Sequence, residues 1–324
     1  APQNFDVTLT GDESIQKRPM GRIIEPLSMM GAQIESIRKN NCAPLKICGK
    51  PLAGIHYTSK VASAQVKSAI LLAGLYADGE TRVTEPQLSR NHTELMLRFF
   101  GADVRTENTT AIISPATELY GNKIQVPGDI SSAVYFVAAG LFLPNSEILI
   151  KNVGINPTRA GLLTVCKNMG ANITLLNETW DSSEPTADLL VRSSALEGTV
   201  IEGAVIPAMI DELPTVALMA CFAEGTTVIK DASELKVKES NRIAIMAENL
   251  KAMGADVTET EDGMIMRGGR PLHGAVINSH KDHRIAMTFA AAALAAEGET
   301  EILDADCVNI SYPAFYEDLG RLCR

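Results

Sequence analysis

Residues 243–255 read IAIMAENLKAMGA. The apolar residues recur at intervals of three and four, which predicts an amphipathic helix that ends at Gly254. Glycine readily adopts the left-handed conformation that follows the last turn of many helices. The same Gly-Ala ending occurs at residues 31, 101, 170 and 254, which gives steps of 70, 69 and 84 residues. The chain is therefore built from repeats.

Each repeat also contains a second, more apolar helical stretch. These stretches are AQVKSAILLAGLYADG (64–79), SAVYFVAAGLFLPN (132–145), ELPTVALMACFAEG (212–225) and HRIAMTFAAAALAAEG (283–298). A short strand-like segment follows each of them. Helices of about 12 residues that alternate with short strands predict an α/β protein with the approximate repeat order βαβαββ.

The sequence divides near VPGD (126–129), where proline and glycine interrupt the pattern. We expect a first domain over 1–125 with about two repeat units. We expect a second domain over 126–324 with three units. The first domain is then one unit short, and we expect it to be incomplete.

Composition excludes several classes of protein. The chain has 324 residues, a net charge of −10 and a pI near 5.1, which argue against nucleic acid as a partner. No apolar run approaches 18 residues, so we expect no contact with a membrane. The six cysteines form no C-x-x-C pair and indicate a reduced, cytoplasmic chain.

Phosphate-loop, dinucleotide-binding and zinc-protease motifs do not occur in the sequence. We therefore expect neither a cofactor nor a metal site.

Polar clusters precede or begin several of the predicted helices. A solvated charge run or ordinary helix capping explains each cluster by itself. If several starts converge, their N–H groups and cations form an anion-binding pocket instead. The clusters contain Arg18, then Ser63 and Gln65, then Ser89 and Arg90, then Asp211, then Lys238, Glu239 and Arg242, and finally Asp282, His283 and Arg284.

Two of these motifs, VKESNR (237–242) and KDHRIAM (281–287), resemble the enolpyruvyl transferases, in particular the branch that acts on shikimate 3-phosphate. GDESIQKRPMG (11–21), ASAQVKSA (62–69) and SRNHTELML (89–97) match in the same order. The S-A-Q stretch within ASAQVKSA resembles the second microbial class of that branch. The resemblance covers essentially the whole chain.

The resemblance implies an α/β fold of two domains built from βαβαββ repeats, with helix N-termini that point into an interdomain cleft. It implies transfer of the enolpyruvyl group of phosphoenolpyruvate to the 5-hydroxyl of shikimate 3-phosphate, with release of phosphate. The partners are then small anionic substrates.

Residue roles follow from the same resemblance. The phosphoenolpyruvate ligands are expected to be Arg18, Lys238, Arg242 and Arg284. The shikimate 3-phosphate ligands are expected to be Ser63, Gln65, Ser89, Arg90 and Asp211. The catalytic groups are expected to be Asp211 as the base near the 5-hydroxyl, Lys238, Glu239 in proton transfer and His283 in support.

Three departures from the family pattern occur in this chain. The Lys-Ser pair followed by Arg, and the Asn-Ala-Gly-Thr loop, do not occur here. Ile310 also stands where many members have a lysine. We therefore expect the family's amino-terminal quarter to be lacking and the isolated chain to have little or no turnover. A complementing amino-terminal segment or self-association would then supply what the first domain lacks.

Two alternatives remain open. The chain could be a non-catalytic, anion-binding fragment, which the departures favour. It could also act on UDP-N-acetylglucosamine, but that enzyme usually carries a cysteine near the position of 11–21, and none occurs there.

Overall fold

The computed structural model describes residues 1–13, 15–116, 118–180 and 184–323. Contacts within the chain define two compact units. Unit 1 comprises Ala1–Gln125 with Ser182–Glu184, and unit 2 comprises Val126–Asp181 and Pro185–Arg324. The division after Gln125 lies beside the Val-Pro-Gly-Asp stretch that predicts a domain boundary.

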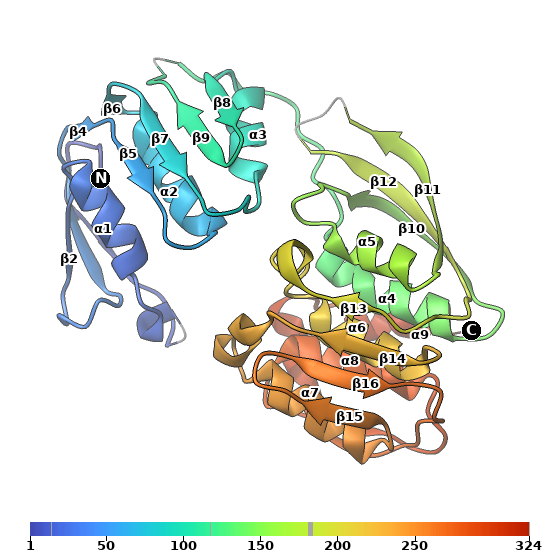
Figure 1. Cartoon of the computed structure of the whole chain (residues 1–324). Coiled ribbons are helices and arrows are strands. Elements are labelled where there is room, and N and C mark those ends of the chain that lie inside the picture. Colours follow the sequence, from blue (N-terminus) through green and yellow to red (C-terminus); the bar gives the residue numbers. More distant parts are fainter. Residues whose placement is uncertain (14, 117, 181–183, 324) are drawn as a thin grey trace. The chain divides into compact units, whose positions relative to one another are not determined.

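The described residues of unit 1 form an α/β body (Figure 1). Its elements are β1 (Val7–Leu9), α1 (Gly21–Met29), β2 (Gln33–Ser36), β3 (Leu45–Cys48), β4 (Leu52–Ala53), β5 (His56–Thr58), α2 (Ala64–Gly74), β6 (Ala77–Asp78), β7 (Thr81–Thr84), α3 (His92–Phe99), β8 (Val104–Glu107) and β9 (Thr110–Ile113). The succession β5–α2–β7–α3–β8–β9 is one βαβαββ repeat. Its strands form a sheet in the order β5-β7-β9-β8, against which α2 packs.

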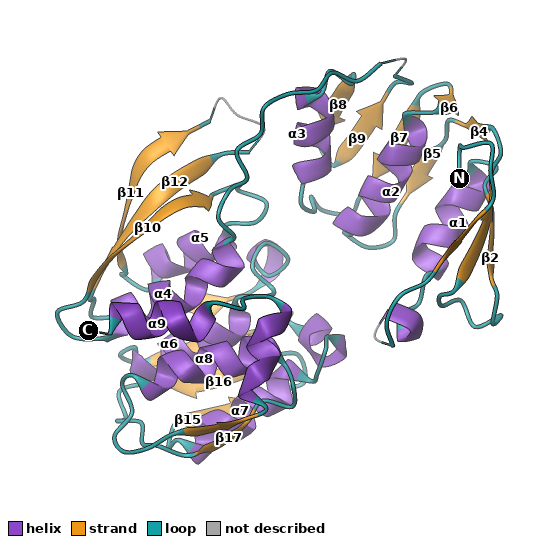
Figure 2. Ribbon diagram, turned by 180° about the vertical axis from the view of Figure 1, so that it is seen from behind, coloured by secondary structure: helices purple, strands orange, loops and turns teal. Residues whose placement is uncertain are grey.

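Unit 2 is larger, and its sheets surround a helical centre (Figure 2). Its elements are α4 (Ile130–Phe142), β10 (Glu147–Gly154), α5 (Gly161–Asn168), β11 (Asn172–Thr179), β12 (Thr186–Arg192), β13 (Val200–Ile201), α6 (Leu213–Phe222), β14 (Thr226–Ile229), α7 (Arg242–Ala252), β15 (Asp256–Glu259), β16 (Met264–Arg267), β17 (Val276–Asn278), α8 (His283–Ala293), β18 (Glu301–Leu303) and α9 (Phe315–Leu322). Short 3₁₀ turns occupy Gly203–Val205, Ser233–Val237 and Ala305–Ile310. The sheets have the orders β10-β12-β11, β13-β14-β16-β15 and β17-β18.

The centre of unit 2 consists of α4, α6 and α8, which pack against one another. Nearly every residue of these helices is buried, which explains why their sequences are apolar all round. Helix α4 also contacts β10 and β12, α6 contacts β14 and β16, and α8 contacts β17 and β18, so these sheets share one core. The polar residues at the helix starts therefore lie at the ends of the core helices. Among the described residues, no helix has the length and apolar character needed to cross a membrane.

The predicted helix endings are confirmed. The glycines at 31, 101, 170 and 254 all have positive φ, between 74° and 98°. In each case the amide of the following alanine donates to a carbonyl five residues earlier, at 2.9 or 3.0 Å. This pattern is a Schellman motif, which requires the left-handed residue that glycine provides.

The α/β class and the repeated order are also confirmed, but the last repeat differs from the others. Its described residues contain β17, α8, β18 and α9, without the closing strand pair that β15 and β16 provide in the preceding repeat. The count of two and three units per domain stays a prediction.

A buried ion cluster lies in unit 1 near the start of α2. The Lys67 ammonium lies 3.0 Å from a carboxylate oxygen of Glu85 and 2.8 Å from one of Glu94. All three side chains are at most 3% exposed. Buried charges of this kind are tolerated only while each has its partner.

Replacement of Lys67 by methionine should therefore destabilise unit 1 by about 3–5 kcal/mol, because two carboxylates lose their buried counter-ion. Urea unfolding followed by circular dichroism measures the change. Lys17→Met is the control, since Lys17 pairs with Glu13 at the surface and should leave the transition where it is. An unchanged transition in Lys67→Met would contradict the structural role of the cluster.

Candidate active site

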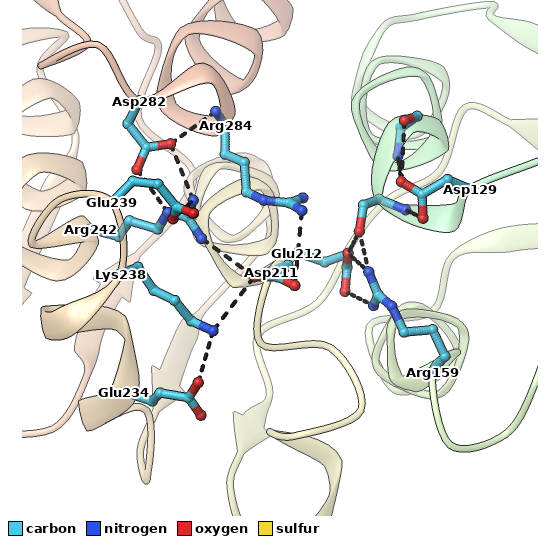
Figure 3. Close-up of polar contacts among 12 residues, drawn as sticks. Asp129, Arg159, Asp211, Glu212, Glu234, Lys238, Glu239, Arg242, Asp282 and Arg284 are labelled. Atoms are coloured by element: carbon cyan, nitrogen blue, oxygen red, sulfur yellow. Dashed lines mark hydrogen bonds and ion pairs between the residues drawn. The ribbon is translucent and has the colours of Figure 1, made fainter. Parts of the chain in front are cut away.

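The most buried cation of unit 2 is Arg242, at the first position of α7. Its side chain is 1% exposed. Nε donates to Asp282 at 2.9 Å and one Nη donates to Glu239 at 2.7 Å. The other Nη lies 3.4 Å from Asp211. A single guanidinium thus joins the residues around the starts of α6, α7 and α8 (Figure 3).

We call the group Asp211, Lys238, Glu239, Arg242, Asp282 and Arg284 the cation–carboxylate cluster. Asp211 lies between the three cations, with Lys238 Nζ and an Nη of Arg284 each 3.9 Å from its oxygens. These distances are longer than hydrogen bonds, and the Asp211 side chain is 17% exposed. Asp211 therefore lies within ion-pair distance of Lys238 and Arg284, but these two separations are too long for hydrogen bonds.

Helix capping does not account for Asp211. The N-cap of α6 is Glu212, and its side chain makes no capping hydrogen bond. By contrast, Asp282 caps α8 by accepting from the Arg284 amide at 3.0 Å, and Ser63 caps α2. The capping interpretation thus holds for Asp282 and Ser63, although both also lie in the clusters described here.

Lys238 and Glu239 occupy the rim of the cluster. Lys238 is 22% exposed and pairs with Glu234 at 2.8 Å on its outer side. Glu239 is 39% exposed. Because both side chains reach solvent, a ligand can approach them without unfolding of the core.

The pKa values of Asp282 and His283 respond to their burial. Burial alone would raise the pKa of Asp282, but hydrogen bonds and charge from Arg242 outweigh it and hold this pKa below 3.8. Burial lowers the pKa of His283 below 6.5, and the charge of Arg284 lowers it further. At neutral pH an ionised Asp282 therefore stands beside an uncharged His283 at the start of α8.

A second buried ion pair lies behind Asp211. Glu212 is fully buried and accepts from Arg159 at 2.5 and 2.8 Å and from the Ser131 hydroxyl at 2.5 Å. Arg159 also donates to the Ser131 hydroxyl. In Figure 3 the carboxylate of Asp211 faces the three cations of the cation–carboxylate cluster, whereas that of Glu212 faces Arg159 on the other side. The pair ties the start of α6 to the start of α4.

Unit 1 contains a separate polar group, which we call the serine cluster: Ser63, Lys67, Glu85 and Ser89. Glu85 accepts from the Ser63 amide at 2.9 Å and from the Ser89 hydroxyl at 2.9 Å. Ser63 is partly buried and Ser89 is 7% exposed. Two of the predicted shikimate 3-phosphate ligands are thus linked through one carboxylate.

The other predicted ligands of unit 1 lie nearer the surface. Gln65 is exposed and its side-chain oxygen accepts from Arg22 at 2.7 Å. Arg18 is exposed and Arg90 is partly exposed.

Sequence reasoning does not single out Arg159, Glu212, Lys67, Glu85 or Glu94. Lys67 does carry a signal, because a lysine that follows Val66 in an apolar helix must bury its charge or turn outward. Arg159 offers no comparable signal, since it precedes a helix by two residues, as many surface arginines do. Within the described ranges, the structure contains no group of three or more His, Cys, Asp or Glu arranged to hold a metal ion.

Comparison with known proteins places this geometry in a family. The sequence profile of EPSP synthase (3-phosphoshikimate 1-carboxyvinyltransferase) matches residues 1–319. A 3-phosphoshikimate 1-carboxyvinyltransferase of Thermoanaerobacter is 56% identical over 322 residues, which is 99% of this chain and 76% of the relative. That of Geobacter sulfurreducens is 54% identical over 315 residues, which is 97% of this chain and 73% of the relative.

A solved structure is similar as well. The EPSP synthase from Acinetobacter baumannii superposes with a TM-score of 0.91 at 46% identity, over 99% of this chain and 74% of that protein. The chain therefore spans about three quarters of the length of these relatives. With the match of the profile to nearly every residue, it belongs to the EPSP synthase (3-phosphoshikimate 1-carboxyvinyltransferase) family.

Proposed function

We propose that this chain binds phosphoenolpyruvate and shikimate 3-phosphate and takes part in transfer of the enolpyruvyl group to the 5-hydroxyl, with release of phosphate. The observation that carries the proposal is the convergence of Asp211 with Lys238, Arg242 and Arg284. Three cations around one partly exposed carboxylate suit anionic substrates and a hydroxyl that loses a proton.

Within the cation–carboxylate cluster, Arg284 and Lys238 are the cations best placed to hold the phosphate and carboxylate of phosphoenolpyruvate. Arg284 is 17% exposed, and Lys238 is held only at the rim. Arg242 contributes its charge and the Nη that faces Asp211, since Asp282 and Glu239 occupy its other nitrogens. Arg18 of unit 1 is proposed as a further ligand on the sequence resemblance alone.

In this proposal Asp211 and Glu239 carry out the proton transfers of the reaction. In the addition step the 5-hydroxyl loses a proton to Asp211 while its oxygen bonds to the central carbon of phosphoenolpyruvate. The methylene carbon gains a proton from Glu239, with His283 in support. In the elimination step the new methyl group returns a proton and the C–O bond to phosphate breaks. The cations stabilise the charged tetrahedral intermediate throughout.

In unit 1 we propose that Ser63, Gln65, Ser89 and Arg90 bind shikimate 3-phosphate. Hydroxyl, amide and guanidinium groups suit both a phosphate and a polyhydroxylated ring.

We also propose that the chain works in the reducing cytoplasm, because its six cysteines are all free thiols.

Arg284→Met should weaken phosphoenolpyruvate binding about 10- to 100-fold, because a charge-assisted contact to the anion is lost. Calorimetric titration at saturating shikimate 3-phosphate measures the affinity. Arg192→Met is the matched control, since Arg192 pairs with Glu147 on the surface of the same unit. Equal affinities in the two variants would remove Arg284 from the site.

Stability should fall on acidification in a window set by His283. The folded pKa lies below 6.5 and the unfolded pKa lies near 6.5, so the unfolded state binds more protons between them. Stability contributed by neutral His283 is present above pH 6.5 and is lost as the pH falls. Asp282 titrates only below 3.8, so it does not contribute to this window.

The melting temperature of the parent chain should therefore drop more steeply between pH 7.5 and 5.5 than that of His283→Gln. Thermal unfolding at several pH values measures the difference. His273→Gln, which alters an exposed histidine of the same unit, should retain the parent's slope. Identical slopes in parent and His283→Gln would show that His283 is not held neutral.

Turnover by the 324-residue chain alone should be slow, because the Lys-Ser and Asn-Ala-Gly-Thr motifs do not occur in it. Loss of charged ligands from one site costs orders of magnitude in rate. A phosphate-release assay with both substrates, beside an intact mass of the sample, measures this. Release by the purified chain at about 1 per second or faster, a typical enzymatic rate, would contradict the expectation.

A further inference from the structure

Glu85, directly after β7, is the acceptor on which the serine cluster converges. One oxygen accepts from the Ser63 amide at 2.9 Å. The other accepts from the Ser89 hydroxyl at 2.9 Å and the Ser89 amide at 3.3 Å, and lies 3.0 Å from Lys67 Nζ. With a side-chain exposure of 1%, the carboxylate has little room to move.

These contacts join two segments that are far apart in sequence. Ser63 stands at the N-cap of α2, and Ser89 lies in the loop before α3. Glu85 accepts from the backbone amides of both residues and so links the two serines directly, while Lys67 of α2 also donates to the Ser89 carbonyl at 3.4 Å. Lys67 is the buried counter-ion of Glu85.

We propose that Glu85 is a positioning residue for shikimate 3-phosphate: it sets the separation and direction of Ser63 and Ser89 without touching the substrate. The inference rests on the proposed function, since it requires that these serines bind that ligand. Ligand groups generally need support within about 0.5 Å to keep their affinity.

The Ser89 hydroxyl shows how the arrangement operates. A serine hydroxyl has one proton, and in this structure Ser89 donates it to Glu85. To donate to a phosphate, the hydroxyl must turn from Glu85 to the ligand. The Ser89 amide and the Ser63 amide stay on the carboxylate during this turn, so the backbone remains in place while the proton changes partner.

Glu94 provides a matched comparison for Glu85. It also pairs with Lys67, at 2.8 Å, and is 3% exposed. Its second carboxylate oxygen has no hydrogen-bond partner within the described part of the chain. Unlike Glu85, Glu94 therefore does not join Ser63 to Ser89. The two glutamates therefore share burial and counter-ion and differ in their contact with the serines.

The experiment compares Glu85→Asp with Glu94→Asp in the full 324-residue chain. Each change shortens a carboxylate by one methylene and keeps the net charge. Calorimetric titration with shikimate 3-phosphate gives the affinity, and thermal unfolding gives the stability. We expect Kd to rise about tenfold in Glu85→Asp and to stay within about twofold of the parent in Glu94→Asp.

A purely structural role would lower the melting temperature of both variants and leave their affinities alike, and that result would overturn the inference. If Glu85→Asp does not fold, Glu85→Gln and Glu94→Gln form the second pair. The Ser63 and Ser89 amides donate to different oxygens of Glu85, and a glutamine has an acceptor oxygen at only one of these two positions. The same difference in Kd between these two variants is expected, and equal values would overturn the proposal.

Ser89→Ala separates failure of the inference from failure of the proposed function. If the parent chain does not bind shikimate 3-phosphate, or if Ser89→Ala binds as the parent does, the assignment of the ligand site is wrong. If Ser89→Ala weakens binding while Glu85→Asp matches Glu94→Asp, the site stands and the positioning role of Glu85 is wrong.

Discussion

The buried guanidinium of Arg242 is the constraint on which the site in unit 2 depends. It is 1% exposed and contacts carboxylates from three parts of the chain, at Asp211, Glu239 and Asp282. A charge so deeply buried requires these partners, because an unpaired one would cost several kcal/mol. The helix starts around Arg242 are therefore held in one arrangement, and Lys238 and Arg284 are left at the accessible side of it.

Unit 1 meets the same constraint with a different cation. Lys67 is enclosed by Glu85 and Glu94, and the serines proposed as ligands are attached to Glu85. In unit 2, Glu212 and Arg159 form a comparable pair behind Asp211. In each unit a buried ion pair thus contacts or adjoins the groups that we propose to bind a ligand. Such pairs give little net stability, so their effect is to fix the geometry of the surrounding side chains.

Much of the fold could be predicted from the sequence because its signals are local. The Gly-Ala endings specify the left-handed residue of a Schellman motif, and each of the four has it. The apolar composition of the core helices alone predicts that they form a buried centre. The buried ion pairs could not be predicted, because the partners of Arg159 and Lys67 lie far along the chain and depend on packing. For the same reason the sequence suggests Arg242 as a ligand but not that Asp282 and Glu239 occupy two sides of it.

Hydrogen–deuterium exchange of the 324-residue chain, with and without shikimate 3-phosphate and phosphoenolpyruvate, is the most direct test of the account. It shows whether the serine cluster and the cation–carboxylate cluster bind these two substrates. The account predicts that both ligands together slow exchange in 59–69 and 85–92 of unit 1 and in 208–214 and 236–243 of unit 2. Shikimate 3-phosphate alone should already slow exchange in the two segments of unit 1. Slower exchange in only one unit with both ligands present, or only in segments outside these four, would contradict it.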